Sequence, residues 1–136
     1  MPRKTNPNAP ADWLLISASD VAGLKHLAEA EISHAMCRSK LAEVLEKILK
    51  AELLRLGWPL LKTHDVQHLA SELDARGSDL SRIYRPLAQE LAEVYFTDRY
   101  PGFDLEDPDW PDFRAKLAEV EKLLAAVQAR LPQPKS

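Results

Sequence analysis

The fold of this chain depends most on the segment LAEVLEKILKAELLRLG, which spans residues 41–57. A weak break near Ser33 and His34 lets a helix begin before it, Gly57 favours the end of that helix, and Pro59 prevents it from resuming. The large apolar residues recur every three or four positions, the period of an α-helix with a broad buried face: Leu41, Leu45, Ile48, Leu49, Leu53 and Leu56.

The preceding segment predicts a first helix that opens near residues 17–20. Ser17 and Asp20 have the spacing of a capping box, although that box prefers Glu or Gln as its second acid. An apolar stripe at helical spacing follows, formed by Leu24, Leu27, Ala28 and Ile32. We therefore expect this helix to begin at about Ser17.

The segment after Pro59 predicts a third helix. Thr63 suits its N-cap position, and Asp65 lies favourably near the positive end of the helix dipole. Gly77 marks the point where this helix stops.

Two more helices are predicted toward the C-terminus. The fourth begins between Asp79 and Pro86, with Pro86 in its first turn or at a kink, and buries Leu87, Leu91, Val94 and Tyr95. The fifth opens at Pro111 and is lined by Phe113, Leu117, Val120, Leu124 and Val127. Short connections favour antiparallel neighbours, so we predict an all-α, up-and-down bundle of about five helices.

The composition is that of one soluble domain. The 136 residues are 46% hydrophobic and 29% charged, with a net charge of −3, which argues against a general nucleic-acid binder. Cys37 is the single cysteine, no signal peptide is evident, and no apolar run could span a membrane, so we expect a cytoplasmic protein. Proline-rich, polar ends predict flexible tails at residues 1–12 and 132–136 around a domain at residues 13–131.

Three charged groupings have ordinary structural explanations. His64 and His68 stand at i and i+4 with Asp65 between them, but no third ligand is indicated, and we expect neither a metal nor a cofactor. The pairs Glu43–Lys47 and Glu46–Lys50 have the spacing of ion pairs on a solvated helix face. The acids between residues 98 and 112 lack the spacing of a calcium loop and predict a solvated loop.

The segment YFTDRYPG, residues 95–102, is the most ambiguous. Arg99 lies between Asp98 and Tyr100 at a predicted helix end, where a guanidinium beside an aromatic ring suits a phosphate or a base. It equally suits the negative end of the helix dipole, or a structural pair with Asp65 or Asp98. Both interpretations remain open at this point.

Several short motifs occur together in a recognisable order. They are Trp13, the start at residues 18–21 (ASDV), residues 46–51 (EKILKA), the Gly57 stop, residues 62–66 (KTHDV) and residues 99–102 (RYPG). In this order and spacing the chain resembles the prokaryotic HEPN domain over residues 13 to 131. The resemblance implies a four-helix core with extensions that usually dimerises, often beside a small nucleotidyltransferase-type partner protein. It also implies a ligand site for nucleotide or RNA at the matching polar positions, which are Lys47, Lys50, His64, Asp65, Asp98, Arg99 and Tyr100.

Many HEPN domains are toxin ribonucleases with an arginine followed after four to six residues by histidine. The arginine stabilises charge that develops on the phosphorus centre, and the histidine moves a proton. This chain has histidines only at positions 26, 34, 64 and 68, none correctly spaced after an arginine, and none follows Arg99. We therefore expect a non-catalytic module that binds a nucleotide or a partner protein. The alternative is a toxin-like endoribonuclease with a divergent site.

Overall fold

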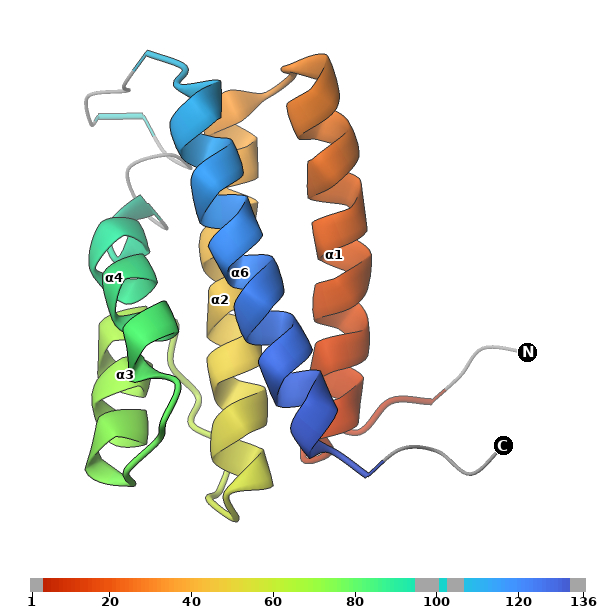
Figure 1. The fold of residues 1–136 in the computed structure, drawn as a ribbon, viewed down its shortest axis with the longest axis vertical. Helices are drawn as coiled ribbons and strands as arrows, with labels where there is room; N and C mark the ends of the chain where they lie inside the picture. The colour runs from red at the N-terminus through yellow and green to blue at the C-terminus, as the bar shows by residue number, and fades with distance from the viewer. Residues whose placement is uncertain (1–3, 95–100, 103–106, 133–136) are drawn as a thin grey trace.

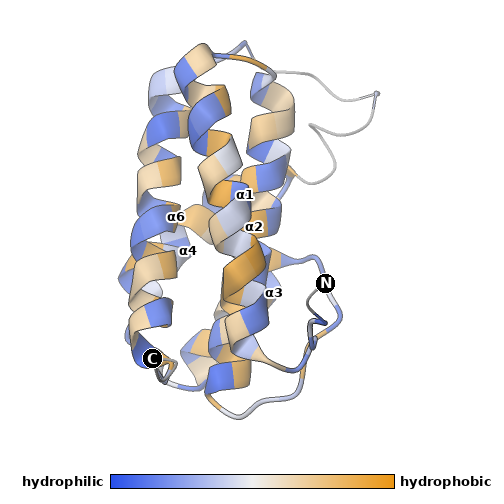
Figure 2. Ribbon diagram, turned by 90° about the vertical axis from the view of Figure 1, so that its right-hand side faces the viewer, coloured by the Kyte–Doolittle hydropathy of each residue, from blue (hydrophilic) through white to orange (hydrophobic). Residues whose placement is uncertain are grey.

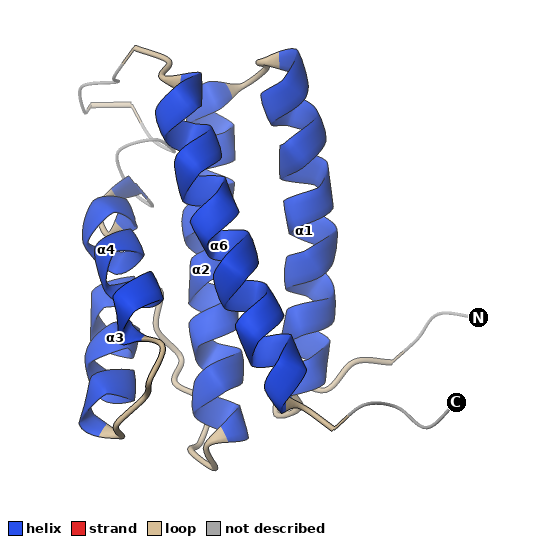
Figure 3. Ribbon diagram, in the orientation of Figure 1, coloured by secondary structure: helices blue, strands red, loops and turns tan. Residues whose placement is uncertain are grey.

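The computed structural model describes residues 4–94, 101–102 and 107–132. Within these residues the helices are α1 (Pro10–Ala30), α2 (His34–Arg55), α3 (Val66–Ala75), α4 (Ser81–Leu91) and α6 (Trp110–Arg130), as Figure 1 shows. The described residues contain no strand (Figure 3). The predicted all-α helical bundle is confirmed.

Helix α2 is the central element of the bundle. It contacts α1, α3, α4 and α6, and it is buried around most of its circumference (Figure 1). Five of the six predicted apolar positions lie in the core: Leu41, Leu45, Ile48, Leu49 and Leu53. Leu56 was wrongly placed on this face, because α2 ends at Arg55 and the chain turns at Leu56 and Gly57, which leaves Leu56 36% exposed.

Helix α1 begins earlier than the sequence predicted. It starts at Pro10, whose fixed φ angle suits a first turn, so the predicted start at Ser17 is wrong. Ser17 is buried in mid-helix, where its hydroxyl donates to the Trp13 carbonyl at 2.8 Å. Such a bond to the carbonyl four residues earlier satisfies a serine inside a helix. The capping-box spacing of Ser17 and Asp20 therefore does not mark the start of α1. Ile32 lies beyond the end of α1 and is 51% exposed, off the predicted stripe.

Helix α3 begins at Val66 with Asp65, not Thr63, as its N-cap. The Asp65 carboxylate accepts from the backbone N–H groups of Gln67 and His68, at 3.0 and 3.2 Å. The hydroxyl oxygen of Thr63 accepts only from the Asp65 N–H, one step before the helix. The predicted stop is confirmed, since Gly77 has a φ of 72° that a glycine adopts without strain.

Helices α4 and α6 follow the predicted stripes. Pro86 lies inside α4 rather than in its first turn, while Leu87, Leu91 and Val94 are buried; Tyr95 lies outside the described residues. The five apolar residues predicted for the last helix are all in the core, and the carboxylate of Asp109 caps its start by accepting from the Asp112 N–H. Hydrophobic and hydrophilic residues alternate along these helices (Figure 2).

One polar network joins the C-terminal ends of α2 and α6. Arg130 donates to both carboxylate oxygens of Asp79, at 2.7 and 2.8 Å, and to the buried Glu52 at 3.2 Å. Arg55 pairs with the same Glu52 from the preceding turn of α2. The hydrogen bond from Arg130 lowers the pKa of Asp79, and the same contact raises the pKa of Arg130.

Candidate functional site

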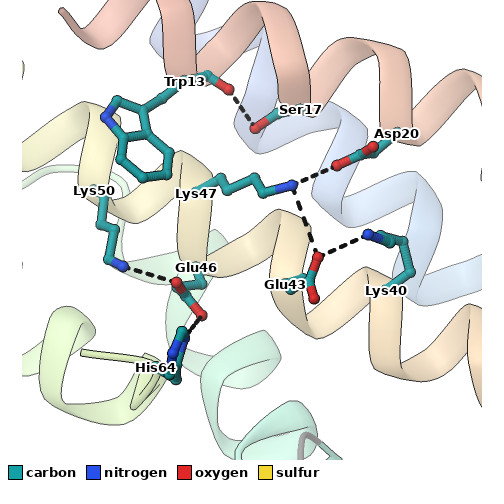
Figure 4. A network of polar contacts seen from close by, with 9 residues as sticks. All are labelled: Trp13, Ser17, Asp20, Lys40, Glu43, Glu46, Lys47, Lys50 and His64. Atoms are coloured by element: carbon teal, nitrogen blue, oxygen red, sulfur yellow. Dashed lines mark hydrogen bonds and ion pairs between the residues drawn. The ribbon is translucent and has the colours of Figure 1, made fainter. Parts of the chain in front are cut away.

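Three of the predicted site residues lie together on one side of α2. Lys47 and Lys50 project from α2, and His64 reaches the same region from the segment before α3 (Figure 4). Acidic side chains lie beside all three: Asp20 beside Lys47, and Glu46 beside Lys50 and His64. We call this group, with Lys40, Asp20, Glu43 and Glu46, the α2 polar cluster.

Glu46 is the buried centre of this cluster. One of its carboxylate oxygens accepts from Lys50 Nζ at 2.7 Å, and the other lies 3.0 Å from His64 Nδ1. The side chains of Glu46 and Lys50 are each only 7% exposed. The predicted ion pair is therefore present, but its predicted solvated position is wrong, because α2 is enclosed by its neighbours. The Trp13 ring lies against this pair, with its centroid 5.5 Å from Lys50 Nζ.

Lys47 connects α2 to α1. Its ammonium donates to the Asp20 carboxylate at 2.7 Å, and Glu43 of the preceding turn lies 3.8 Å away. Glu43 also pairs with Lys40 at 2.8 Å. Each of these lysines thus has a carboxylate beside it, and both side chains of the Lys47–Asp20 pair are largely shielded from solvent.

Within the described residues, the lysines and the carboxylates of this cluster are equal in number. Lys40, Lys47 and Lys50 face Asp20, Glu43 and Glu46, so an incoming phosphate would compete with carboxylates that already hold the ammonium groups. His64 is the exposed member, with 64% of its side chain accessible. The cluster connects α2 to α1 through Lys47 and Asp20, and to the segment before α3 through Glu46 and His64.

The remaining predicted site residues are Asp65, Asp98, Arg99 and Tyr100. Asp65 is exposed and caps α3. The residues Asp98, Arg99 and Tyr100 lie outside the described residues, so the pairing of Arg99 with Asp65 or Asp98 stays a prediction.

Sequence reasoning missed the part that Asp20 plays in the cluster. We had assigned Asp20 to a capping box, yet it is the partner of Lys47, 27 positions along the chain. Local spacing carries no signal for such a contact. The one available clue was that Lys47 and Asp20 both belong to the motifs that resemble the HEPN domain.

No metal site is formed by the part of the chain that the structure describes. His64 and His68 do not gather with further ligands, and no group of three or more His, Cys, Asp or Glu side chains is placed to hold an ion within the described ranges. Among the same residues, no helix is both long enough and apolar enough to cross a membrane.

Comparison with known families agrees with this architecture. The HEPN domain matches residues 11–130, which include all five described helices except the first residue of α1. The chain belongs to the HEPN domain family. No curated protein and no solved structure matches it.

Proposed function

We propose that this chain is a non-catalytic HEPN module that binds a nucleotide or a partner protein of the nucleotidyltransferase type. The observation that carries the proposal is the absence of any histidine after Arg99, since the last histidine in the sequence is His68. Without an imidazole at that spacing, the motif lacks the group that would move a proton from a ribose hydroxyl. The charge balance of the α2 polar cluster also favours a structural role for its lysines.

Nucleotide binding can be tested by thermal unfolding with ATP as the probe. We expect ATP to raise the melting temperature of the wild type and Arg99→Ala to abolish that rise, because a guanidinium is the group suited to phosphate. Arg82→Ala is the matched control, since Arg82 is an exposed arginine on α4. An unchanged melting temperature at millimolar ATP would remove nucleotide binding from the proposal.

Partner binding requires a separate experiment. We expect a nucleotidyltransferase-type protein encoded by a neighbouring gene to co-purify with this chain when the two are co-expressed. A neighbouring gene of unrelated type, or a candidate that elutes separately, would argue against this partner. Growth arrest on induction, relieved by Arg99→Ala at equal protein level, would instead support the ribonuclease alternative.

We also propose that the module is a homodimer that pairs through the outer face of α1. Leu15 and Ile16 on this face are 48% and 40% exposed, and the small residues Ala22 and Gly23 continue the exposed surface toward the end of the helix. Apart from its chain neighbours and the backbone of its own helix, nothing lies within 4 Å of the position that a Cβ of Gly23 would occupy, so this surface is open. An apolar face of this kind is typical of a helix that packs against a partner.

The oligomeric state tests this second proposal. Light scattering at micromolar concentration should give a dimer for the wild type and a monomer for the double variant Leu15→Glu with Ile16→Glu. The control carries Ile32→Glu and Met36→Glu, which alter an equally exposed apolar pair at the α1–α2 corner. A monomeric wild type, or loss of the dimer only in the control, would refute pairing through α1.

A further inference from the structure

A groove between α3 and α4 has the features of a second, separate binding site. It encloses about 210 Å³, which is small beside the cavities of about 300–1,000 Å³ that hold drug-sized ligands. Ala70 and Ala88 are almost fully buried and form its floor. Its walls are polar and come from both helices: Gln67, Ser71, Asp74, Arg85 and Gln89.

Three of the wall residues have unused hydrogen-bonding groups. Gln67, Ser71 and Gln89 are exposed, and within the described residues their side chains make no hydrogen bond. Each carboxamide offers both a donor and an acceptor, and the serine hydroxyl offers the same. The groove therefore presents matched donors and acceptors rather than charge.

The one charged pair in the groove is already neutralised. Arg85 pairs with the Asp74 carboxylate, which also accepts from the hydroxyl of the buried Tyr84 at 2.5 Å. The lining thus carries no net charge, which favours a neutral ligand over a phosphate or a metal ion. The Asp74–Arg85 contact marks one end of the groove, and Gln67 lies seven positions before Asp74 on α3. At 1.5 Å per helical residue the groove is about 10 Å long.

We propose that the α3–α4 groove binds a short extended backbone segment of a partner protein. A peptide unit is neutral and carries one donor and one acceptor, which match a carboxamide in a paired geometry. At about 3.3 Å per residue, a groove of about 10 Å accommodates about three extended residues. The alanine floor leaves room for small side chains only. This site is separate from the dimer face proposed on α1.

Titration of the isotope-labelled protein with N-acetyl-trialanine amide tests the proposal. The backbone amides of Ala70 and Ala88 should show saturable chemical-shift changes, with a dissociation constant in the millimolar range. The double variant Gln67→Ala with Gln89→Ala should weaken this binding at least tenfold while its spectrum remains that of a folded protein. Gln128→Ala is the matched control, because Gln128 is an exposed glutamine on α6, away from the groove.

Three outcomes would overturn the proposal. The first is the absence of saturable shifts with the peptide, and the second is equal affinity in the double variant and the wild type. The third is a response of the same two amides to adenosine monophosphate but not to the peptide, which would assign the groove to a nucleotide. Because Arg99→Ala leaves the groove residues intact, failure of ATP binding and failure of peptide binding are distinguishable.

Discussion

At the scale of single residues, the α2 polar cluster depends on Glu46. Its carboxylate is the acceptor for Lys50 and the neighbour of His64, and both Glu46 and Lys50 are buried. A buried ion pair contributes little net stability over an apolar pair of the same size, but the loss of one partner leaves an uncompensated charge.

Substitution of Glu46 should therefore be costly. We expect Glu46→Ala to lower the free energy of unfolding by about 3 kcal/mol, because the Lys50 ammonium loses its buried acceptor. Glu119→Ala is the matched control, since Glu119 pairs with Lys122 on the surface of α6, where 44% of its side chain is exposed, and its loss should cost about 1 kcal/mol or less. Urea denaturation with fitted midpoints measures both variants. Equal losses in the two would show that burial of Glu46 has no energetic consequence.

At the scale of elements, the start of α3 shows that the N-cap is Asp65 and not Thr63, the residue that the sequence predicted. Thr63 and Asp65 are both residue types that favour the N-cap position, and we had predicted Thr63 there, with Asp65 only as an acid near the helix dipole. The structure gives Asp65 two backbone N–H donors from α3 and gives Thr63 none from within the helix.

The two capping residues should differ in their effect on stability. Asp65→Ala should cost about 1 kcal/mol, the usual loss when an N-cap side chain is removed. Thr63→Ala should cost less than half of that, because its acceptor bonds only the N–H of Asp65. Thermal and urea unfolding of the two variants under one set of conditions compares them. A larger loss for Thr63→Ala would contradict the assigned cap.

The elements also show what sequence patterns can and cannot reveal. Apolar spacing located the buried faces of α2 and α6, because burial of large side chains is the dominant driving force and imposes its own period. The starts of helices were harder to predict. Ser17 and Asp20 have the spacing of a capping box, yet Ser17 lies in mid-helix, where its hydroxyl bonds the Trp13 carbonyl. The contact between Lys47 and Asp20 depends on how α1 packs on α2, which no local pattern encodes.

At the scale of the whole molecule, the network of Arg130, Asp79 and Glu52 links stability to pH. It joins the end of α6 to the end of α2 and to the connection before α4. The hydrogen bond from Arg130 lowers the pKa of Asp79 in the folded state. A carboxyl group with a lowered folded pKa contributes stability above its unfolded pKa, and that contribution is lost as the pH falls through the folded pKa.

Substitution of Asp79 should therefore change how the stability of the protein depends on pH in the acid range. The wild type should lose stability as the pH falls below about 4, and Asp79→Asn should be less stable at neutral pH but lose less over the acid range. Urea midpoints between neutral and acid pH measure this difference. Parallel curves for Asp79→Asn and the wild type would show that Arg130 does not couple Asp79 to folding.

The enclosure of α2 also has a kinetic consequence for its backbone amides. A peptide N–H at the middle of α2 can reach solvent only when the surrounding helices move apart, whereas α3 and α4 can separate from the bundle with less disruption. Exchange of amide hydrogen for deuterium should then be slowest around Leu45 to Leu49, at a rate that reports complete unfolding. The amides of α3 and α4 should exchange sooner, through partial opening of the molecule.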